Sequence, residues 1–547
     1  MPKKKTNNPE TLVIGAGELG LADFIAVACH GRPVSFAPEV SRRVDGGREY
    51  VESAVAWATG EAPPPDGTTA EDFYIYGITT GLGEFKRVIL RSEEEAHQLQ
   101  INLLRSHACG VGPALPESVA RGAMLMRLQT FSQGHSGVRF ALLEKIAEFL
   151  NRGFHPVIPA QGSVGSSGDL CPLAHLFLPF IGEGRLRWEG GRDRFGKVDF
   201  EAAELIQAGV MAPYPLTFKE GVALINGTAI STALGLLALH DALNLMAAAN
   251  AAGSLTLEAM RGRSRAFEDP LHRLRRHPGQ IKCAAQVRSL VEGSTLLDGN
   301  SQLQDAYSLR ALPQVHGASW EALEHVRRIL ERELNAVTDN PLFFYHHAPM
   351  DGREHLKHYS GANFHGQPVA LAMDYLALAC AELADISERR TQMLLDHHHN
   401  EGLPACLTDS PGLNSGYMIA QYTAAALVSE NKVLCHPASC DNIPTSANAE
   451  DHNSMAPIAA RQAGEVVNNA LNVVAIEMLC AAQGLDFRLR RGEGRPGRGT
   501  RALYDALRAR VPHLEDDRSL SPEIQRVAQM IRAGEFTLGA GDVPGEA

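Results

Sequence analysis

Much of the chain repeats its apolar residues at helical spacing. Between Trp320 and Leu334, apolar residues recur every three or four positions with Glu and Arg between them. This periodicity predicts an amphipathic helix that buries one face. Three further segments follow the same pattern: 366–390, 413–434 and 455–484. From about Thr217 onward, the pattern predicts an almost entirely helical chain, broken only at Gly492–Gly497.

The first part of the chain mixes short strand-like runs with turns and helices. The expected elements are strands at 11–14 and 34–36, a Pro/Gly break at 62–67, a loop at 72–88, helices from about Ser92, and a small hairpin around Gly190–Gly191. We therefore predict a mainly α fold. A small mixed N-terminal domain (residues 1–215) is expected to precede a long-helix bundle (residues 216–547).

Composition and charge narrow the class of protein. A chain of 547 residues can bury a large core. Its net charge of −12 argues against binding to nucleic acid. The nine cysteines are odd in number and scattered singly, which is typical of reduced thiols in a cytoplasmic protein. The most apolar stretch, Thr232–Leu257, contains His240 and Asp241, so we expect a core helix and no membrane span.

Residues 162–169, Gly-Ser-Val-Gly-Ser-Ser-Gly-Asp, are the most informative segment. Gly165 and Gly168 permit the backbone dihedral angles of a tight loop. If the Gly168 nitrogen attacks the Ser166 carbonyl carbon, a five-membered ring forms. Loss of water, including the Ser167 hydroxyl, then leaves an exocyclic methylidene group. The chain can thus make an imidazolone electrophile from itself, although an ordinary Gly/Ser turn has the same composition.

Residues 162–175 resemble the signature of the aromatic amino acid ammonia-lyases and aminomutases, a family that carries this electrophile, abbreviated MIO. The usual triplet is Ala-Ser-Gly, whereas this chain has Ser166-Ser167-Gly168. Four other segments resemble the family in the same order: 76–83, 226–228, 304–310 and 363–368. The resemblance runs from about Leu12 to about Phe536. It implies a helical homotetramer with shared active sites and a self-formed MIO group, without an external cofactor.

The resemblance also implies roles for individual residues. Tyr76, in a Gly-rich loop that can close over substrate, would be the base that removes the β-proton, provided that its surroundings lower its pKa. Asn226 would donate to the oxygen of the electrophile. Arg310 offers a planar fork for the substrate carboxylate. The other candidates are Tyr307 and Gln304, which would share one face if helical, and Phe364, which could pack on the substrate ring.

Two places bear on the choice of substrate. Ser106-His107 occupies the family's selectivity position, and this pair is typical of histidine ammonia-lyases, although some tyrosine aminomutases have it as well. Residues 443–455 resemble the histidine-lyase version, with Glu450 where tyrosine and phenylalanine enzymes usually have Gln. A carboxylate suits an imidazole, which offers an N–H donor and can become cationic, whereas a phenyl ring would leave it unpaired. L-Histidine is therefore the expected substrate, with urocanate and ammonia as products.

Other residues keep alternatives open. His316-Gly317 and residues 363–368 look more like the tyrosine and phenylalanine branch and the aminomutases. A tyrosine or phenylalanine ammonia-lyase, or a 2,3-aminomutase acting on histidine or another aromatic amino acid, would use the same residues. An inactive helical scaffold that retains the motifs is a further alternative. Ser166 would place a hydroxymethyl group on the ring, away from the methylidene, so we expect the electrophile to form.

Two motifs point to other classes of protein. Gly15–Gly20 fits the dinucleotide fingerprint G-x-G-x-x-G of an NAD(P)-dependent oxidoreductase. That site needs an acidic residue after the next strand, where this chain has Ala37-Pro38, and no repeated strand–helix alternation follows. His346-His347 and His397–His399 could suggest a metal, but no carboxylate/His spacing supports a closed site. We expect neither a dinucleotide nor a metal.

Overall fold

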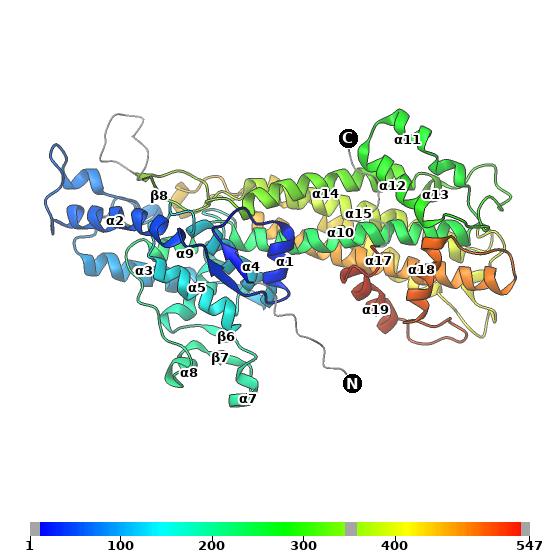
Figure 1. Cartoon of the computed structure of the whole chain (residues 1–547), viewed down its shortest axis with the longest axis horizontal. Helices are drawn as coiled ribbons and strands as arrows, with labels where there is room; N and C mark the ends of the chain where they lie inside the picture. The colour runs from blue at the N-terminus through cyan, green and yellow to red at the C-terminus, as the bar shows by residue number, and fades with distance from the viewer. Residues whose placement is uncertain (1–10, 345–357, 538–547) are drawn as a thin grey trace. The chain divides into compact units, whose positions relative to one another are not determined.

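The computed structural model describes residues 11–344 and 358–537, whose contacts separate the chain into two units. The first unit combines residues 1–237, 328–371 and 438–461. The second unit combines residues 238–327, 372–437 and 462–547. The fold is mainly α with a few short strands, which confirms the fold class expected from the sequence (Figure 1). The domain boundary expected at residue 215 stays a prediction.

Short helices and small sheets make up most of the first unit. Its helices are α1 (Leu21–Ala28), α2 (Val40–Thr59), α3 (Glu93–His107), α4 (Glu117–Phe131), α5 (Phe140–Arg152), α6 (Leu170–Phe177), α7 (Gly191–Phe195), α8 (Ala202–Gln207) and α9 (Glu220–Ile225). Its strands are β1 (Leu12–Ile14), β2 (Val34–Phe36), β3 (Val111–Ala114), β4 (His155–Pro156), β5 (Pro159–Gln161), β6 (Arg185–Arg187), β7 (Asp199–Glu201), β8 (Leu342–Phe343) and β9 (His358–Tyr359).

The strands form four separate small sheets among the described residues. β1 and β2 pair in parallel, while β3–β5, β4–β6–β7 and β8–β9 are antiparallel. The expected hairpin is present as β6 and β7, but the five-residue helix α7 joins its strands. Gly190 and Gly191 therefore lie at the start of that helix and not in a two-residue turn.

Four long helices carry the bundle: α10 (Ala229–Ala259), α14 (Leu312–Leu334), α15 (Gln367–Leu395) and α17 (Ala456–Arg490). The remaining α-helices of the second unit are α11 (Asp269–Arg275), α12 (Pro278–Leu290), α13 (Tyr307–Arg310), α16 (Met418–Leu434), α18 (Arg498–Arg508) and α19 (Ser521–Arg532). The long helices coincide with the segments whose periodicity predicted them. Within the segment at 413–434, residues 413–417 form turns ahead of α16. The expectation of a break only at Gly492–Gly497 is wrong, because residues 291–306, 396–417 and 435–455 also contain no α-helix.

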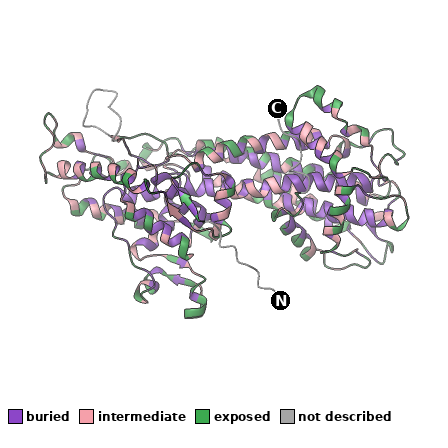
Figure 2. Cartoon of the chain, viewed as in Figure 1, coloured by how far each residue is buried: buried purple, intermediate pink, exposed green. Residues whose placement is uncertain are grey.

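α10 and α17 are long and apolar enough to cross a membrane by length and composition. In their most apolar windows, 67% and 94% of the residues are nevertheless buried inside the protein. A helix that is apolar on all sides is stable in water only when neighbouring elements cover it. The burial colouring of Figure 2 shows both helices as largely buried, which agrees with the core helix expected at Thr232–Leu257.

A buried ion pair connects three of the long helices in the second unit. The Arg390 guanidinium on α15 donates from Nη2 to Glu477 Oε2 on α17 over 2.8 Å, and both side chains are fully buried. Thr256 on α10 and Ser387 on α15 donate their hydroxyls to the same carboxylate over 2.7 and 2.6 Å. Glu477 thereby fixes the relative register of α10, α15 and α17.

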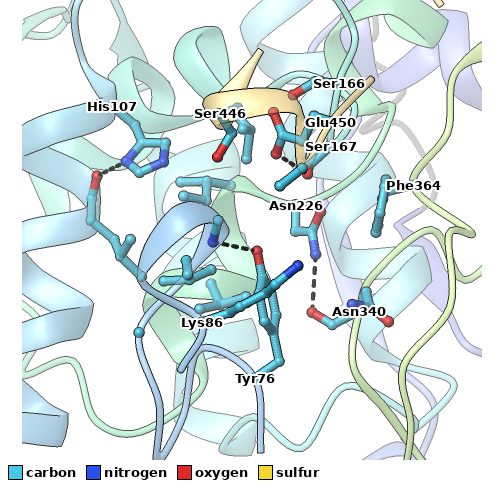
Figure 3. Close-up of a pocket in the computed structure, with 18 of the residues that line it drawn as sticks. Tyr76, Lys86, His107, Ser166, Ser167, Asn226, Asn340, Phe364, Ser446 and Glu450 are labelled. Carbon is cyan, nitrogen blue, oxygen red and sulfur yellow. Dashed lines mark hydrogen bonds between the residues drawn. The ribbon is translucent and has the colours of Figure 1, made fainter. Parts of the chain in front are cut away.

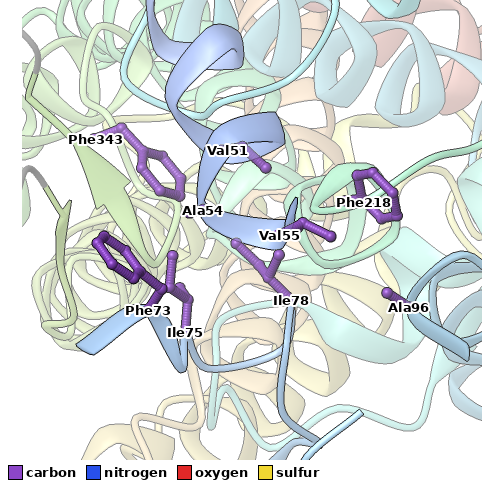
Figure 4. Close-up of a cluster of buried hydrophobic side chains, with 9 residues drawn as sticks. All are labelled: Val51, Ala54, Val55, Phe73, Ile75, Ile78, Ala96, Phe218 and Phe343. Carbon is purple, nitrogen blue, oxygen red and sulfur yellow. The ribbon is translucent and has the colours of Figure 1, made fainter. Parts of the chain in front are cut away.

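The first unit has an apolar core beside the Tyr76 loop. Nine buried side chains, drawn in Figure 4, make up this cluster: Val51, Ala54, Val55, Phe73, Ile75, Ile78, Ala96, Phe218 and Phe343. They come from α2, from the 3-10 helix η1 (Ala70–Phe73) and the loop after it, from α3, from the segment before α9 and from β8. Phe73, Ile75 and Ile78 flank Tyr76, so this core anchors the base of the loop that carries the tyrosine.

Replacing Glu477 with Ala should destabilise the protein by about 3–5 kcal/mol, because Arg390 would keep a buried charge without its partner. Urea unfolding followed by circular dichroism measures this loss. Glu465→Ala is the matched control, since Glu465 is exposed on the same helix. Surface substitutions of this kind change the free energy of unfolding by about 0.5 kcal/mol or less. Equal unfolding midpoints for the two variants would contradict the role given to Glu477.

Candidate active site

Most of the candidate residues meet in one cavity of about 710 Å³ in the first unit. Its lining includes the Tyr76 loop, the end of α3, residues 166 and 167, the end of α9, residues 360–365 and residues 446–452 (Figure 3). Eight residues expected from the sequence line this cavity: Tyr76, Ser106, His107, Ser166, Ser167, Asn226, Phe364 and Glu450. The sequence therefore places these side chains correctly in one site, while their individual roles stay predictions.

Two glycine backbones meet directly after Ser167 and Asn226, which line the cavity. Gly168 and Gly227 have φ angles of +77° and +134°, and the two residues form an isolated parallel β-bridge. The Asp169 N–H donates to the Gly227 carbonyl over 2.8 Å, and the Gly227 N–H donates to the Ser167 carbonyl over 3.2 Å. A Cβ at Gly168 would lie 2.2 Å from the Gly227 oxygen. Only glycine permits this approach, which sets Ser167 beside Asn226.

Asp169 ties the same loop to the first turn of α10. Its fully buried carboxylate accepts from the backbone N–H groups of Ile230 and Ser231 over 2.8 and 2.9 Å, and from the Ser231 hydroxyl over 2.7 Å. Burial raises the pKa of Asp169 to about 6, and these hydrogen bonds oppose the rise. A carboxylate at a helix N-terminus is favoured by the helix dipole. These hydrogen bonds anchor Asp169, the last residue of the loop at 162–169, to the start of α10.

Asn226 rests on a buried network of charged and polar groups. Its side-chain amide donates to the Asn340 carbonyl over 3.0 Å. The Lys219 ammonium donates to the same carbonyl over 3.1 Å and to both Asp339 carboxylate oxygens over 2.8 Å. Burial lowers the pKa of Lys219, and the Asp339 carboxylate opposes this effect. The buried Asn226 Oδ1 has no protein partner, so the amide retains capacity to bind a group in the cavity.

The Tyr76 hydroxyl points into the cavity and accepts a hydrogen bond from the Gly83 N–H over 2.9 Å (Figure 3). Burial is the largest influence on this phenol and raises its pKa. The Gly83 N–H lowers the pKa, while the charge of Glu450 raises it. The geometry suits a base, but the pKa lies in the opposite direction from the one that a base needs.

Glu450 lies beside Ser167 and Asn226, whereas His107 lies farther along the cavity wall (Figure 3). Glu450 accepts from the Ser167 hydroxyl over 3.3 Å and from the Thr445 hydroxyl over 2.9 Å. His107 Nδ1 contacts the Leu103 carbonyl at 2.9 Å, which assigns the proton to Nδ1 and leaves Nε2 as an acceptor. Burial lowers the pKa of His107 and so favours the neutral ring. The site thus presents two acceptors to a ligand.

Ser106 and Phe364 line the cavity with fewer contacts. The Ser106 hydroxyl lies 3.4 Å from the Leu103 carbonyl and 3.0 Å from Nδ1 of His107. It therefore lies beside the His107 ring. Phe364 is half-buried. Next to it, His365 stacks on His452 with ring centroids 5.8 Å apart. Phe364 gives the cavity an apolar surface, and the two imidazoles add flat polar rings beside it, so a planar ligand can lie there.

Gln304, Tyr307 and Arg310 belong to the second unit, and none of them lines this cavity. Tyr307 is 72% exposed, and the Arg310 guanidinium lies over its ring at 4.4 Å from the centroid. Gln304 precedes the short helix α13, so the helical geometry under which Gln304 and Tyr307 would share a face is absent. Gln304 and Tyr307 are exposed and Arg310 is half-buried, so all three side chains lie at the surface of the second unit.

The dinucleotide-like loop has a different role in the structure. β1, α1 and β2 do form a strand–helix–strand unit, but its sheet contains only two strands in the described part of the chain. A Cβ at Gly15 would lie 2.4 Å from Val40 Cγ2 on α2, and Arg43 donates to the Gly15 carbonyl over 3.2 Å. Helix α2 therefore covers the loop that would have to approach a pyrophosphate.

His346 and His347 lie outside the described residues. His397, His398 and His399 follow the end of α15 in an exposed turn, so they do not lie on a helix. Asp396, His397 and His398 bring potential ligand atoms within 4.8 Å of one another. The Asp396 carboxylate also accepts from His399 Nδ1 over 2.8 Å. This group lies on the surface of the second unit, and the expectation of no metal stays a prediction.

Several residues of the site did not stand out in the sequence. Lys219 and Asp339 form the buried ion pair, Asn340 connects it to Asn226, and Lys86 lines the cavity beside Tyr76. One signal was available for Lys219: together with Glu220 it interrupts an apolar run from Val210 to Ile225. Charged residues inside a segment that becomes buried need partners. Nothing in the sequence identified Asp339 as that partner.

Known proteins share this fold and sequence over almost the whole chain. The model of the aromatic amino acid lyase family matches residues 19–509. The histidine ammonia-lyase of Symbiobacterium thermophilum is 48% identical, covering 98% of this chain and 99% of that protein. Histidine ammonia-lyase from Trypanosoma cruzi aligns with a TM-score of 0.84 and 37% identity, covering 96% of this chain and 94% of the other.

A second branch of the family is also structurally close. Tyrosine aminomutase from Streptomyces globisporus aligns with a TM-score of 0.84 and 36% identity, covering 96% of this chain and 97% of the other. The fold is therefore shared between lyases and aminomutases. The family match and the near-complete coverage decide the question of kinship: this chain belongs to the aromatic amino acid lyase family.

Proposed function

We propose that this protein is a histidine ammonia-lyase, which converts L-histidine to urocanate and ammonia. The observation that carries this proposal is the pairing of Glu450 and His107 in one cavity with Ser167. The Glu450 carboxylate and His107 Nε2 offer two acceptors, which match the two N–H donors of a protonated imidazole. The histidine ammonia-lyase of Alkaliphilus oremlandii, 46% identical over 96% of this chain, supports the same substrate.

The loop at 166–168 fits a self-formed MIO group. Ser166 and Ser167 line the cavity, and the Gly227 backbone lies too close to Gly168 for a side chain at position 168. Asn226, with its unpartnered buried Oδ1 and its remaining amide hydrogen, would hold the ring, since an amide can orient either end toward it. When formed, the group supplies an electron-poor methylidene that captures the substrate amine and makes it a better leaving group.

The chain's own residues complete the reaction. Tyr76, as the phenolate, takes the proton from the β-carbon, and the electrons of that C–H bond form the new double bond as the C–N bond breaks. Phe364 provides an apolar surface for the planar product, and the stacked rings of His365 and His452 lie beside it. Closure of the Tyr76 loop over the cavity would exclude water during these steps.

A homotetramer would bring the remaining candidates to the cavity. Arg310, Tyr307 and Gln304 are well suited to bind a substrate carboxylate, yet they do not line the cavity of their own chain. We propose that a second copy supplies them, with Arg310 as the carboxylate clamp and Tyr307 as a catalytic residue. Exposed apolar residues on α15 and α16, such as Tyr375 and Tyr422, support association between copies. We also propose a cytoplasmic location, which fits the odd number and single spacing of the nine cysteines in the sequence.

A 2,3-aminomutase is the second candidate, and a specific likeness favours it. Tyrosine aminomutase from Streptomyces globisporus shares the fold at 36% identity. An aminomutase performs the same elimination, retains the ammonia and adds it back at the β-carbon, so the residues above would serve both outcomes.

A screen with histidine, tyrosine and phenylalanine, read by ultraviolet absorbance and by mass, tests the proposal. Urocanate as the main product supports it, whereas β-amino acids or coumarate would overturn it.

Replacing Ser167 with Ala should abolish elimination, because the hydroxyl lost in forming the methylidene is absent. Intact-mass spectrometry gives an independent readout: the wild-type chain should be lighter than its sequence by two waters, and the variant should not reach that loss. Ser166→Ala, which restores the usual triplet, is the matched control and should keep both the mass loss and the activity. Near wild-type elimination by Ser167→Ala would exclude the MIO group.

Replacing Glu450 with Gln should lower kcat/KM for histidine by about one to two decades. The substitution keeps the size but removes a charge-assisted hydrogen bond, which is worth roughly 1.5–3 kcal/mol. Any activity toward tyrosine or phenylalanine should fall far less, because neither ring needs the carboxylate. Steady-state kinetics with the three amino acids measure the difference. An equal loss for all three substrates would argue that Glu450 supports the site without selecting the imidazole.

A further inference from the structure

The Tyr76 base leaves one electrostatic problem unsolved. A phenol acts as a base only after it loses its proton, yet burial and the charge of Glu450 both raise the pKa of Tyr76. Two further carboxylates, Glu84 and Asp451, line the same cavity. The Gly83 N–H is the one group of the protein that lowers this pKa noticeably in the described residues. A phenolate here needs a positive charge beside it.

Lys86 is the only lysine or arginine among the described residues that line the cavity. The other groups that could carry a positive charge there are His107, His365 and His452. Burial favours the neutral form of His107 by lowering its pKa. In Figure 3 the Lys86 side chain extends along Tyr76, with its ammonium end toward the phenol oxygen.

The backbone links Lys86 to Tyr76 through a single residue. Gly83 donates its N–H to the Tyr76 hydroxyl over 2.9 Å, and its carbonyl accepts from the Lys86 N–H over 3.2 Å. The 3-10 helix η2 (Gly83–Phe85) therefore begins with the Gly83 N–H and is followed directly by Lys86, the two groups that can stabilise the phenolate. Lys86 is itself exposed, so its flexible stem can bring the ammonium to the phenol as the loop closes.

We propose that Lys86 is a further catalytic residue, whose ammonium stabilises the Tyr76 phenolate that removes the β-proton. The inference rests on the proposed ammonia-lyase function and names the charge that makes its base effective. The proton moves only from the substrate carbon to the phenolate oxygen, and Lys86 takes no part in that transfer. Among the groups around Tyr76, Glu450 opposes the phenolate and the Gly83 N–H favours it. The proposal makes Lys86 the second favourable group.

The test is the pH profile of kcat/KM, whose acid limb reports the loss of the phenol proton. In Lys86→Met this limb should move to higher pH by about one unit, the effect of removing a unit charge several ångströms away at a protein surface. At neutral pH the rate would fall about tenfold, and it would recover at higher pH. Lys86→Arg should return the limb toward its wild-type position. Arg87→Met is the matched control, since Arg87 is the next cation of the same loop but does not line the cavity.

A second measurement does not depend on turnover. The absorbance of tyrosinate, recorded against pH as the difference between wild type and Tyr76→Phe, isolates the titration of this phenol. The same difference on the Lys86→Met background should lie about one pH unit higher. An unmoved acid limb, or a raised KM for histidine with an unmoved limb, would overturn the inference. Failure of the wild type to make urocanate would refute the proposed function, whereas the tyrosinate titration would still decide the role of Lys86.

Discussion

The close contact between the backbones of Gly168 and Gly227 is the constraint on which the site depends. Side chains are absent from both residues, so two main chains distant in the sequence can exchange hydrogen bonds directly. A Cβ on Gly227 would lie 2.6 Å from Arg127 Nη1, so the Arg127 side chain also leaves no room for a side chain at position 227. Because Ser167 and Asn226 are the residues next to these glycines, their separation is set by covalent geometry and not by flexible side chains.

Buried charges determine the positions of the elements around this contact. Lys219 and Asp339 are both fully buried, and their pairing brings the start of α9 to the segment that follows α14. In the second unit, Arg390 and Glu477 do the same for the long helices. Such pairs give little net stability compared with apolar residues, but a charge that loses its partner is costly. Arrangements in which these partners are apart are therefore strongly disfavoured.

The sequence predicted most of the fold and much of the site for identifiable reasons. Long helices such as α17 repeat their apolar residues with a regular period, and a local motif places Ser166 and Ser167 in a tight loop. Cavity residues such as Glu450 were found because they lie within motifs. Lys219 and Asp339 could not be paired, since 120 residues separate them and single charged residues carry no information about their partners. The surroundings of Tyr76 were also beyond the sequence, because a pKa depends on burial and distance.

The loop at 162–169 is synthesised long before some of the residues that bind it. Its Val164 carbonyl accepts from the Met455 N–H over 2.9 Å, and Gly165 accepts from the Ser454 hydroxyl, 289 residues farther along the chain. A ribosome that adds roughly 5–20 residues per second needs about 15–60 seconds to make that intervening chain. For this interval the triplet exists without one wall of its pocket. The loop at 162–169 therefore gains its last hydrogen-bond partners only when the chain is almost complete.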